Sequence, residues 1–231
     1  PRKALAHVLT TIRLLRKELE DRVPLIGFGG APFTMASYAI EGGPSRSYAR
    51  TKTFMYSQPA AWHALCDRFA TVMADYLRAQ IEAGVQAVQV FDSWAGHLSR
   101  NDYVEFALPH TKRIFDALAG AGVPTLHFGV GTSAILAEMK RAGGDVIGVD
   151  WRLPIDEAWA LIGEERGIQG NLDPTALLGP RERMIAAADD VLRRAQGRPG
   201  HIFNLGHGVL PDTDLENLQT LARHVHSFKI G

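Results

Sequence analysis

Six short apolar runs alternate with helix-length segments along this 231-residue chain, and this alternation constrains its fold more than any other feature. Each run is nearly continuous in apolar residues, which is typical of parallel strands that are covered on both faces. The runs occupy residues 24–28, 87–91, 124–128, 146–149, 167–170 and 201–205. Strands that alternate with helices in this way predict an α/β domain built on a parallel sheet.

The remaining question is whether the sheet is open and doubly wound or belongs to a (β/α)8 TIM-like barrel. No Gly-x-Gly-x-x-Gly opens a helix after a strand, since Gly129-Val130-Gly131 lacks the third glycine. Six strands do not close an eight-stranded barrel, and a leading helix over residues 4–18 predicts a strand before it. We therefore expect one domain over residues 1–231, the larger C-terminal part of a (β/α)8 barrel without its first one or two strand–helix units.

The helices that we expect between the strands follow from apolar side chains at helical spacing. The longest covers residues 59–83, and the others cover residues 103–118, 133–141, 155–161, 182–194 and 213–228.

Composition and charge exclude several classes of protein and partner. Lys plus Arg and Asp plus Glu each number 25, so the formal net charge is zero and no whole-molecule field attracts nucleic acid or an anionic membrane. No apolar run approaches the roughly 20 residues that a membrane span needs. The one cysteine, Cys66, excludes an internal disulfide and a multi-cysteine metal site. We expect a cytoplasmic protein without a nucleic-acid or membrane partner.

Polar and glycine residues follow the apolar runs, at the strand ends where both α/β architectures place their sites. His207 stands between Gly206 and Gly208 after the last run, where the small neighbours let a ligand approach the backbone. Its imidazole is suited to donating a hydrogen bond or a proton, with a strand cap as the alternative role. Ser93 follows the second run; its hydroxyl suits an anionic ligand, and a turn serine is the alternative. It lacks the Gly-x-Ser-x-Gly context of a nucleophile.

Three further side chains near the first run are weaker candidates. Tyr38 follows a glycine-bearing segment and can place its hydroxyl in a pocket, although packing in a core is the commoner role of such a tyrosine. Arg46 and Arg50 stand in residues 45–52, which we expect to form a loop. They either give electrostatic support to an acidic ligand or form a solvated face. Asp150, after the fourth run, is a weak candidate for a carboxylate facing the same pocket.

Six blocks of residues resemble the signature of the uroporphyrinogen decarboxylase family, in the family's order and over essentially the whole chain. Two of them are Val90-Phe91-Asp92-Ser93-Trp94-Ala95-Gly96-His97-Leu98 and Asn204-Leu205-Gly206-His207-Gly208. The others are residues 27–34, Tyr38 with residues 41–43, residues 148–151 and residues 170–174.

The resemblance implies a distorted (β/α)8 barrel, usually a homodimer and cytoplasmic in bacteria. It implies a lyase of haem biosynthesis that converts the acetate side chains of uroporphyrinogen III to methyl groups, giving coproporphyrinogen III, without a metal or an organic cofactor. Tyr38, Ser93 and His207 match positions that bind substrate in the family. His207 and Tyr38 would bond to substrate carboxylates, and Ser93 would help to hold a side chain.

One departure from the family pattern concerns the catalytic group. In the family, an arginine-rich loop that binds carboxylates and an aspartate that contacts the pyrrole nitrogens come from the first two strand–helix units. We expect these units to lie upstream of the 231 residues, so that this chain by itself contains no catalytic residue and is inactive.

Three alternatives stay open at this point. One is a relative of the corrinoid-dependent methyltransferases, which share the barrel and bind zinc through thiolates and histidine. Gly129 stands where such a thiolate would lie, and Cys66 falls within a predicted helix. Another is a non-catalytic tetrapyrrole-binding protein that keeps the pocket but does not catalyse decarboxylation. A third and simpler possibility is an open α/β domain with a sugar or phosphate substrate.

Overall fold

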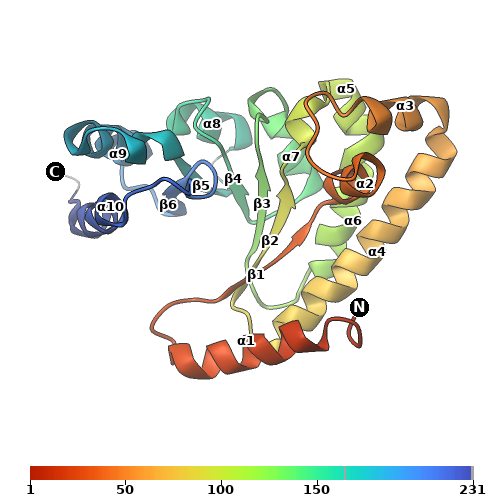
Figure 1. Cartoon of the computed structure of the whole chain (residues 1–231), viewed down its shortest axis with the longest axis horizontal. Helices are drawn as coiled ribbons and strands as arrows, with labels where there is room; N and C mark the ends of the chain where they lie inside the picture. Colours follow the sequence, from red (N-terminus) through yellow and green to blue (C-terminus); the bar gives the residue numbers. More distant parts are fainter. Residues whose placement is uncertain (164, 230–231) are drawn as a thin grey trace.

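A single sheet of six parallel strands forms the centre of the computed structural model, which describes residues 1–163 and 165–229 (Figure 1). The strands are β1 (Ile26–Gly30), β2 (Ala87–Asp92), β3 (Thr125–Gly129), β4 (Val146–Gly148), β5 (Gly167–Leu172) and β6 (His201–Leu205). Their order in the sheet is their order in the chain. In a doubly wound sheet the order in which successive strands are added reverses at a switch point. Here each strand is added on the same side of the one before it, as in a barrel. The predicted fold class is therefore confirmed, with six strands among the described residues.

The helices pack against one another in succession around the sheet. Figure 1 shows this series from α4 and α6 on the right of the view to α9 and α10 on the left, and each helix contacts the next. Its members are α4 (Pro59–Ala83), α6 (Leu108–Leu118), α7 (Leu136–Ala142), α8 (Ile155–Ile162), α9 (Arg181–Ala195) and α10 (Leu215–Ser227). The leading helix α1 (Ala6–Leu19) packs against α4.

The hydrophobic core lies between these helices and one face of the sheet. Val88 and Val90 of β2 share a buried cluster with Leu77 of α4 and with Ile114 and Leu118 of α6. Each fully buried aliphatic side chain of this kind contributes roughly 1.5–3 kcal/mol. The core therefore covers one face of the sheet and leaves the opposite face for a site.

The opposite face of the sheet is partly open to solvent, against our expectation of strands covered on both faces. The central strands β2, β3 and β5 are buried almost throughout, but the edge strands β1 and β6 alternate between buried and exposed residues. Phe28 is 62% exposed and Ile202 is 44% exposed. Only one side of each edge strand is paired among the described residues, so these side chains have neighbours on one side only.

Two helices between β1 and α4 were missed by the sequence prediction. They are α2 (Pro32–Glu41) and α3 (Ala49–Ser57). Pro32 begins α2, where its missing N–H has no helical partner to lose. Gly42 ends it with a φ of +80°, which suits glycine. No helix was predicted over α2, and the start of α3 falls within residues 45–52, which were expected to form a loop.

The helix predicted over residues 103–118 is interrupted in its first half. Tyr103–Ala107 form a π-helical turn in which the Leu108 N–H donates to the carbonyl of Tyr103. Pro109 has no N–H to donate to the residue one turn earlier, and this explains the change of pitch. Among the described residues, no helix combines the length and apolar character that crossing a membrane requires.

Candidate functional site

A cavity of about 480 Å³ at the carboxyl ends of the strands brings Ser93 and His207 together. Ser93 follows β2, and His207 follows β6 at the far edge of the sheet. The other lining residues are Gln89, Phe91, Phe128, Gln169, Asn204, Leu205, Gly208, Val209 and Leu218. The volume is within the range of small-molecule sites, which are mostly apolar with a few placed polar groups.

Phe91 and Phe128 form the floor of this cavity and belong to a longer row of aromatic rings. The ring centroid of Phe91 lies 5.7 Å from that of Phe28 on one side and 5.7 Å from that of Phe128 on the other, edge to face. The row ends at His207, whose ring centroid is 6.5 Å from that of Phe128. Edge-to-face pairs are favourable, so each ring helps to hold the next. The sequence prediction missed this floor, although alternation along β2 places Gln89, Phe91 and Ser93 on one face.

The polar groups of the cavity are mostly uncharged. Below the aromatic floor, Gln169 Nε2 donates to Gln89 Oε1 over 3.3 Å, and both side chains are buried. None of the lining residues that the structure describes is Asp, Glu, Lys or Arg. His207 and the Ser93 hydroxyl are therefore the donors best placed for an anionic group, and the floor suits a flat apolar ring.

Close backbone packing fixes the strand end that carries His207. A Cβ at Gly206 would lie 2.7 Å from the Trp151 backbone nitrogen and 3.0 Å from the Asp150 Cα. The Gly206 N–H also donates to the carbonyl of Leu172 over 2.7 Å. Only glycine permits this approach, so the position of His207 depends on it.

Asp150 holds the neighbouring loops and is absent from the cavity lining. Its Oδ2 accepts from the Gly131 N–H over 2.6 Å and from the Arg152 side chain. The site role considered for this residue is therefore not supported; it anchors the loop after β3 to the end of β4.

Asp92 points to the face of the sheet opposite to Ser93, as the alternation of a strand requires. The Thr34 hydroxyl donates to its Oδ1 over 3.2 Å, and its Oδ2 lies 3.9 Å from His127 Nε2. Asp92 and His127 are both fully buried. This pair belongs to the packing between sheet and helices rather than to the cavity.

Comparison with known proteins identifies the family of this chain. The model of the family described as uroporphyrinogen decarboxylase (URO-D) matches residues 1–228. The chain belongs to the uroporphyrinogen decarboxylase family. This confirms the resemblance seen in the sequence.

Similar curated proteins carry the same family name. A uroporphyrinogen decarboxylase of Carboxydothermus hydrogenoformans is 51% identical over 226 residues, and one of Sorangium cellulosum is 52% identical over 227 residues. Each alignment covers 98% of this chain and 65% of the relative. The chain thus spans slightly less than two thirds of the length of these uroporphyrinogen decarboxylases.

Solved structures share the fold at lower identity. A methyltransferase from Methanosarcina mazei superposes with a TM-score of 0.83 at 22% identity, over 96% of this chain and 64% of that chain. A B12-independent methionine synthase from a Shewanella species superposes with a TM-score of 0.65 at 13% identity, over 94% of this chain and 64% of that chain. At these identities the likeness shows the fold alone.

The third position predicted from the uroporphyrinogen decarboxylase resemblance, Tyr38, is not among the residues that line the cavity. Tyr38 is on α2, and its ring centroid is 3.9 Å from that of Trp94, the residue after Ser93. Arg46 and Arg50 are exposed and are absent from the cavity lining among the described residues. Arg46 is in the turn after α2, whereas Arg50 is on α3 and not in the predicted loop.

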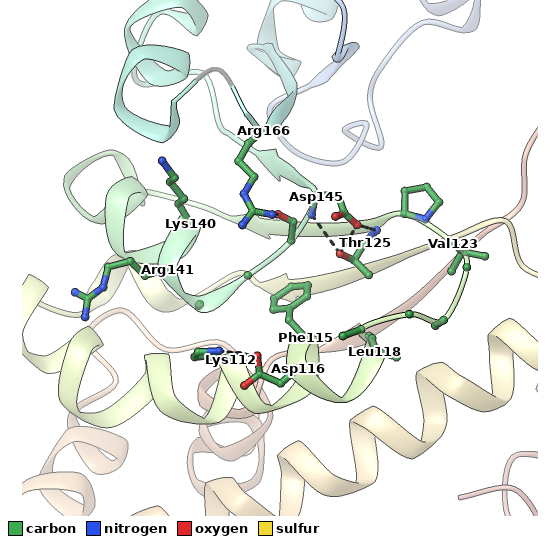
Figure 2. A pocket seen from close by; sticks show the side chains of 18 residues that line it. Lys112, Phe115, Asp116, Leu118, Val123, Thr125, Lys140, Arg141, Asp145 and Arg166 are labelled. Carbon is green, nitrogen blue, oxygen red and sulfur yellow. Dashed lines mark hydrogen bonds and ion pairs between the residues drawn. The ribbon is translucent and has the colours of Figure 1, made fainter.

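A second cavity, of about 610 Å³, lies at the opposite end of the strands, between the ends of α6 and α7 and the starts of β3 and β4 (Figure 2). Three of its four cations serve local partners: Lys112 Nζ donates to Asp116 over 2.6 Å, Lys140 pairs with Glu165, and Arg166 donates to a backbone carbonyl. Figure 2 shows the ends of Lys112, Lys140 and Arg141 pointing apart. The cavity therefore offers no convergent anion site, and barrels carry their chemistry at the other end.

A hydrogen-bonded chain of titratable side chains joins α4 and α6 away from both cavities. His63 Nδ1 lies 2.9 Å from His110 Nε2, and His110 Nδ1 lies 3.0 Å from Asp67 Oδ1. Burial lowers the pKa of His110, and its bond to Asp67 opposes that shift only in part. His110 therefore stays neutral in the folded protein at neutral pH, with its Nδ1 proton directed to Asp67.

Proposed function

We propose that this protein is a uroporphyrinogen decarboxylase, which removes the carboxyl groups of the four acetate side chains of uroporphyrinogen III. The product would be coproporphyrinogen III, in the biosynthesis of haem and other porphyrins. Membership of the family supports the reaction. The observation that carries it is the meeting of Ser93, after β2, and His207, after the edge strand β6, over one aromatic floor.

Each residue has a role in this proposal that its chemistry allows. His207 donates a hydrogen bond to a substrate carboxylate, which is worth about 1.5–3 kcal/mol for a charged acceptor. The Ser93 hydroxyl helps to hold a second side chain, and the Tyr38 hydroxyl bonds to a further carboxylate. The rings of Phe91 and Phe128 pack against the pyrroles. Arg46 and Arg50 raise the positive potential near the mouth.

The reaction needs one group that the cavity does not contain. A pyrrole protonated at its α carbon accepts the electrons of the breaking C–C bond, so no metal or organic cofactor is required. The transient cation then needs a carboxylate, best preorganised in a site with little water. No described lining residue is Asp or Glu, and Asp92 and Asp150 are engaged elsewhere. The proposal therefore assigns this carboxylate, with the main basic clamp for the substrate, to residues outside these 231.

The test compares the full-length protein with the 231-residue chain. Both are incubated anaerobically with uroporphyrinogen III, and the products are separated by the number of carboxyl groups that remain. We expect stepwise decarboxylation by the full-length protein, and binding without turnover by the chain alone. Ser93→Ala and His207→Ala in the full-length protein should each reduce kcat/KM. Binding without turnover by the full-length protein would instead indicate a non-catalytic tetrapyrrole-binding protein.

A second candidate is a corrinoid-dependent methyltransferase, which the fold shared with the Methanosarcina mazei protein favours. That chemistry uses zinc-bound thiolate. Cys66, the one cysteine, is fully buried within α4, and Gly129 ends β3. Among the described residues, no group of three or more His, Cys, Asp and Glu is placed to hold a metal ion. Stoichiometric zinc in the purified full-length protein, with methyl transfer to a thiol, would favour this candidate.

We further propose that the protein is a cytoplasmic homodimer. The support is the resemblance to the family. Sedimentation of the full-length protein at micromolar concentration tests the dimer, and a single species with the mass of one chain would contradict it.

A further inference from the structure

Four aromatic side chains pack against one another in series, with their ring planes tilted, near the end of β2: Tyr38, Trp94, Tyr48 and His97. The ring centroid of Trp94 lies 3.9 Å from that of Tyr38 and 4.8 Å from that of Tyr48. The ring centroid of Tyr48 lies 4.6 Å from that of His97. We call these residues the ring stack.

The ring stack joins two segments that are far apart in the sequence. Tyr38 and Tyr48 come from α2 and from the residue before α3, whereas Trp94 and His97 follow β2. The rings alternate between the two segments, so each segment holds a ring of the other. A change in one ring is therefore transmitted across the junction.

Tyr48 is the most constrained residue of the ring stack, because of its backbone conformation and its burial. It has a φ of +52°, in the left-handed region that side chains other than Gly and Asn rarely adopt. Its side chain is nevertheless 2% exposed, and its N–H donates to the Ser45 hydroxyl over 3.0 Å. A residue persists in such a conformation when its surroundings fix it, and strained positions of this kind gather at functional sites.

Hydrogen bonds brace both segments around the ring stack. The Thr51 N–H and hydroxyl both donate to Glu41 Oε1, over 2.9 and 3.0 Å, which ties the end of α2 to α3. Lys52 Nζ donates to the carbonyl of His97, which ties α3 to the segment after β2. The ring stack is therefore held in place on both sides.

Tyr38 is the free end of this arrangement. It is 48% exposed, and the described residues form no hydrogen bond to its hydroxyl. An exposed tyrosine on a helix changes rotamer readily, and its ring would do so here without Trp94 beneath it. Trp94 in turn follows Ser93 directly, so the contact sets Tyr38 relative to the cavity.

We propose that Trp94 and Tyr48 are positioning residues that fix the orientation of the Tyr38 phenol for a substrate carboxylate. The inference rests on the proposed function. Tyr48 packs against Trp94, and Trp94 packs against Tyr38. Both residues therefore act through the Tyr38 hydroxyl and do not bind the carboxylate themselves. Displacement of a substrate-binding group by about 1 Å can reduce the rate as much as 100-fold, which makes such support consequential.

The test is a double-mutant cycle on decarboxylation of uroporphyrinogen III by the full-length protein. Tyr38→Phe removes the hydroxyl and keeps the ring. Tyr48→Asn removes a ring of the stack with a residue that tolerates the left-handed backbone. We expect each single variant to reduce kcat/KM about tenfold, the effect of one lost aromatic or hydrogen-bonding contact. Tyr48→Asn should have no further effect when Tyr38→Phe is present, because the hydroxyl that it positions is gone.

Two companion variants separate positioning from folding. Tyr48→Phe keeps the ring and should restore the activity that Tyr48→Asn loses. Trp94→Leu should give the same non-additive result with Tyr38→Phe. Effects of Tyr48→Asn and Tyr38→Phe that multiply to about 100-fold would overturn the inference while leaving the function intact. Absence of turnover in the wild-type protein would overturn both proposals, so the two failures are distinguished by the wild-type assay.

Discussion

Replacement of Gly206 by alanine tests whether close packing holds the strand end that carries His207. The added Cβ would lie 2.7 Å from the Trp151 nitrogen and 3.0 Å from the Asp150 Cα, and both are backbone atoms. They cannot move freely, because Asp150 also accepts from the Gly131 N–H over 2.6 Å. Gly206→Ala must therefore displace either the end of β6 or the connection after β4.

The expected magnitude follows from two opposing effects. Adding a methyl group to a packed position costs about 1–3 kcal/mol. Alanine also restricts the unfolded chain, which returns about 0.4–1 kcal/mol. The free energy of unfolding should fall by about 1–2 kcal/mol. For a chain of this size each kcal/mol lowers Tm by about 2–4 °C, so Tm should fall by about 2–8 °C.

Gly208→Ala is the matched control, two residues further along the same segment. A Cβ at Gly208 meets nothing within 4 Å, and the position has no positive φ. Its Tm should stay the same or rise slightly. Urea unfolding followed by circular dichroism gives both free energies, provided that the slope with denaturant is unchanged. Equal stability of Gly206→Ala and Gly208→Ala would refute the argument that backbone contact requires glycine at position 206.

Three other predictions concern histidine and cysteine side chains. His207→Ala should weaken uroporphyrinogen III binding by the full-length protein about 10- to 100-fold in a fluorescence titration, whereas His7→Ala on the exposed face of α1 should not; unchanged affinity would remove His207 from the site. Burial lowers the pKa of His110 below its ordinary 6.5, so the unfolded chain binds a proton first as pH falls. Stability should therefore be full above about pH 6.5 and decline below it; His110→Gln should flatten this decline, and an unchanged profile of unfolding free energy against pH would contradict the assignment. Burial raises the pKa of the Cys66 thiol, so an aromatic disulfide reagent should titrate one thiol after denaturation and almost none before; fast labelling of the native chain would show that α4 opens readily.

The sheet was predictable from the sequence because its signal is local. Each strand is a short apolar run, and the polar residues at strand ends lie together wherever parallel strands share a sheet. This is why Ser93 and His207 were expected in one pocket, and they do share it. The two missed helices, α2 and α3, lack such a local signal. Glycines flank α2 and charged residues begin α3, and both features are also typical of loops.

The contacts of Tyr38 could not be predicted in the same way. Its neighbour Trp94 is on another segment, and nothing in the spacing of aromatic residues indicates which rings meet. The same holds for the row of aromatic rings in which Phe28, Phe91 and Phe128 come from three strands. Contacts of this kind depend on the register between neighbouring strands. That register is fixed only when the strands pair in the folded sheet, so the sequence pattern of one strand does not show it.

The agreement between strand order and chain order affects how the protein can be made. Every strand after β1 pairs with the strand that precedes it in the chain, so its partner has already left the ribosome when it emerges. Because each new strand requires closure of only one intervening segment, the sheet can grow from β1 toward β6 without waiting for the end of the chain. Synthesis can thus proceed together with folding, and among the described strands the last to join the sheet is β6, which carries His207 to the site.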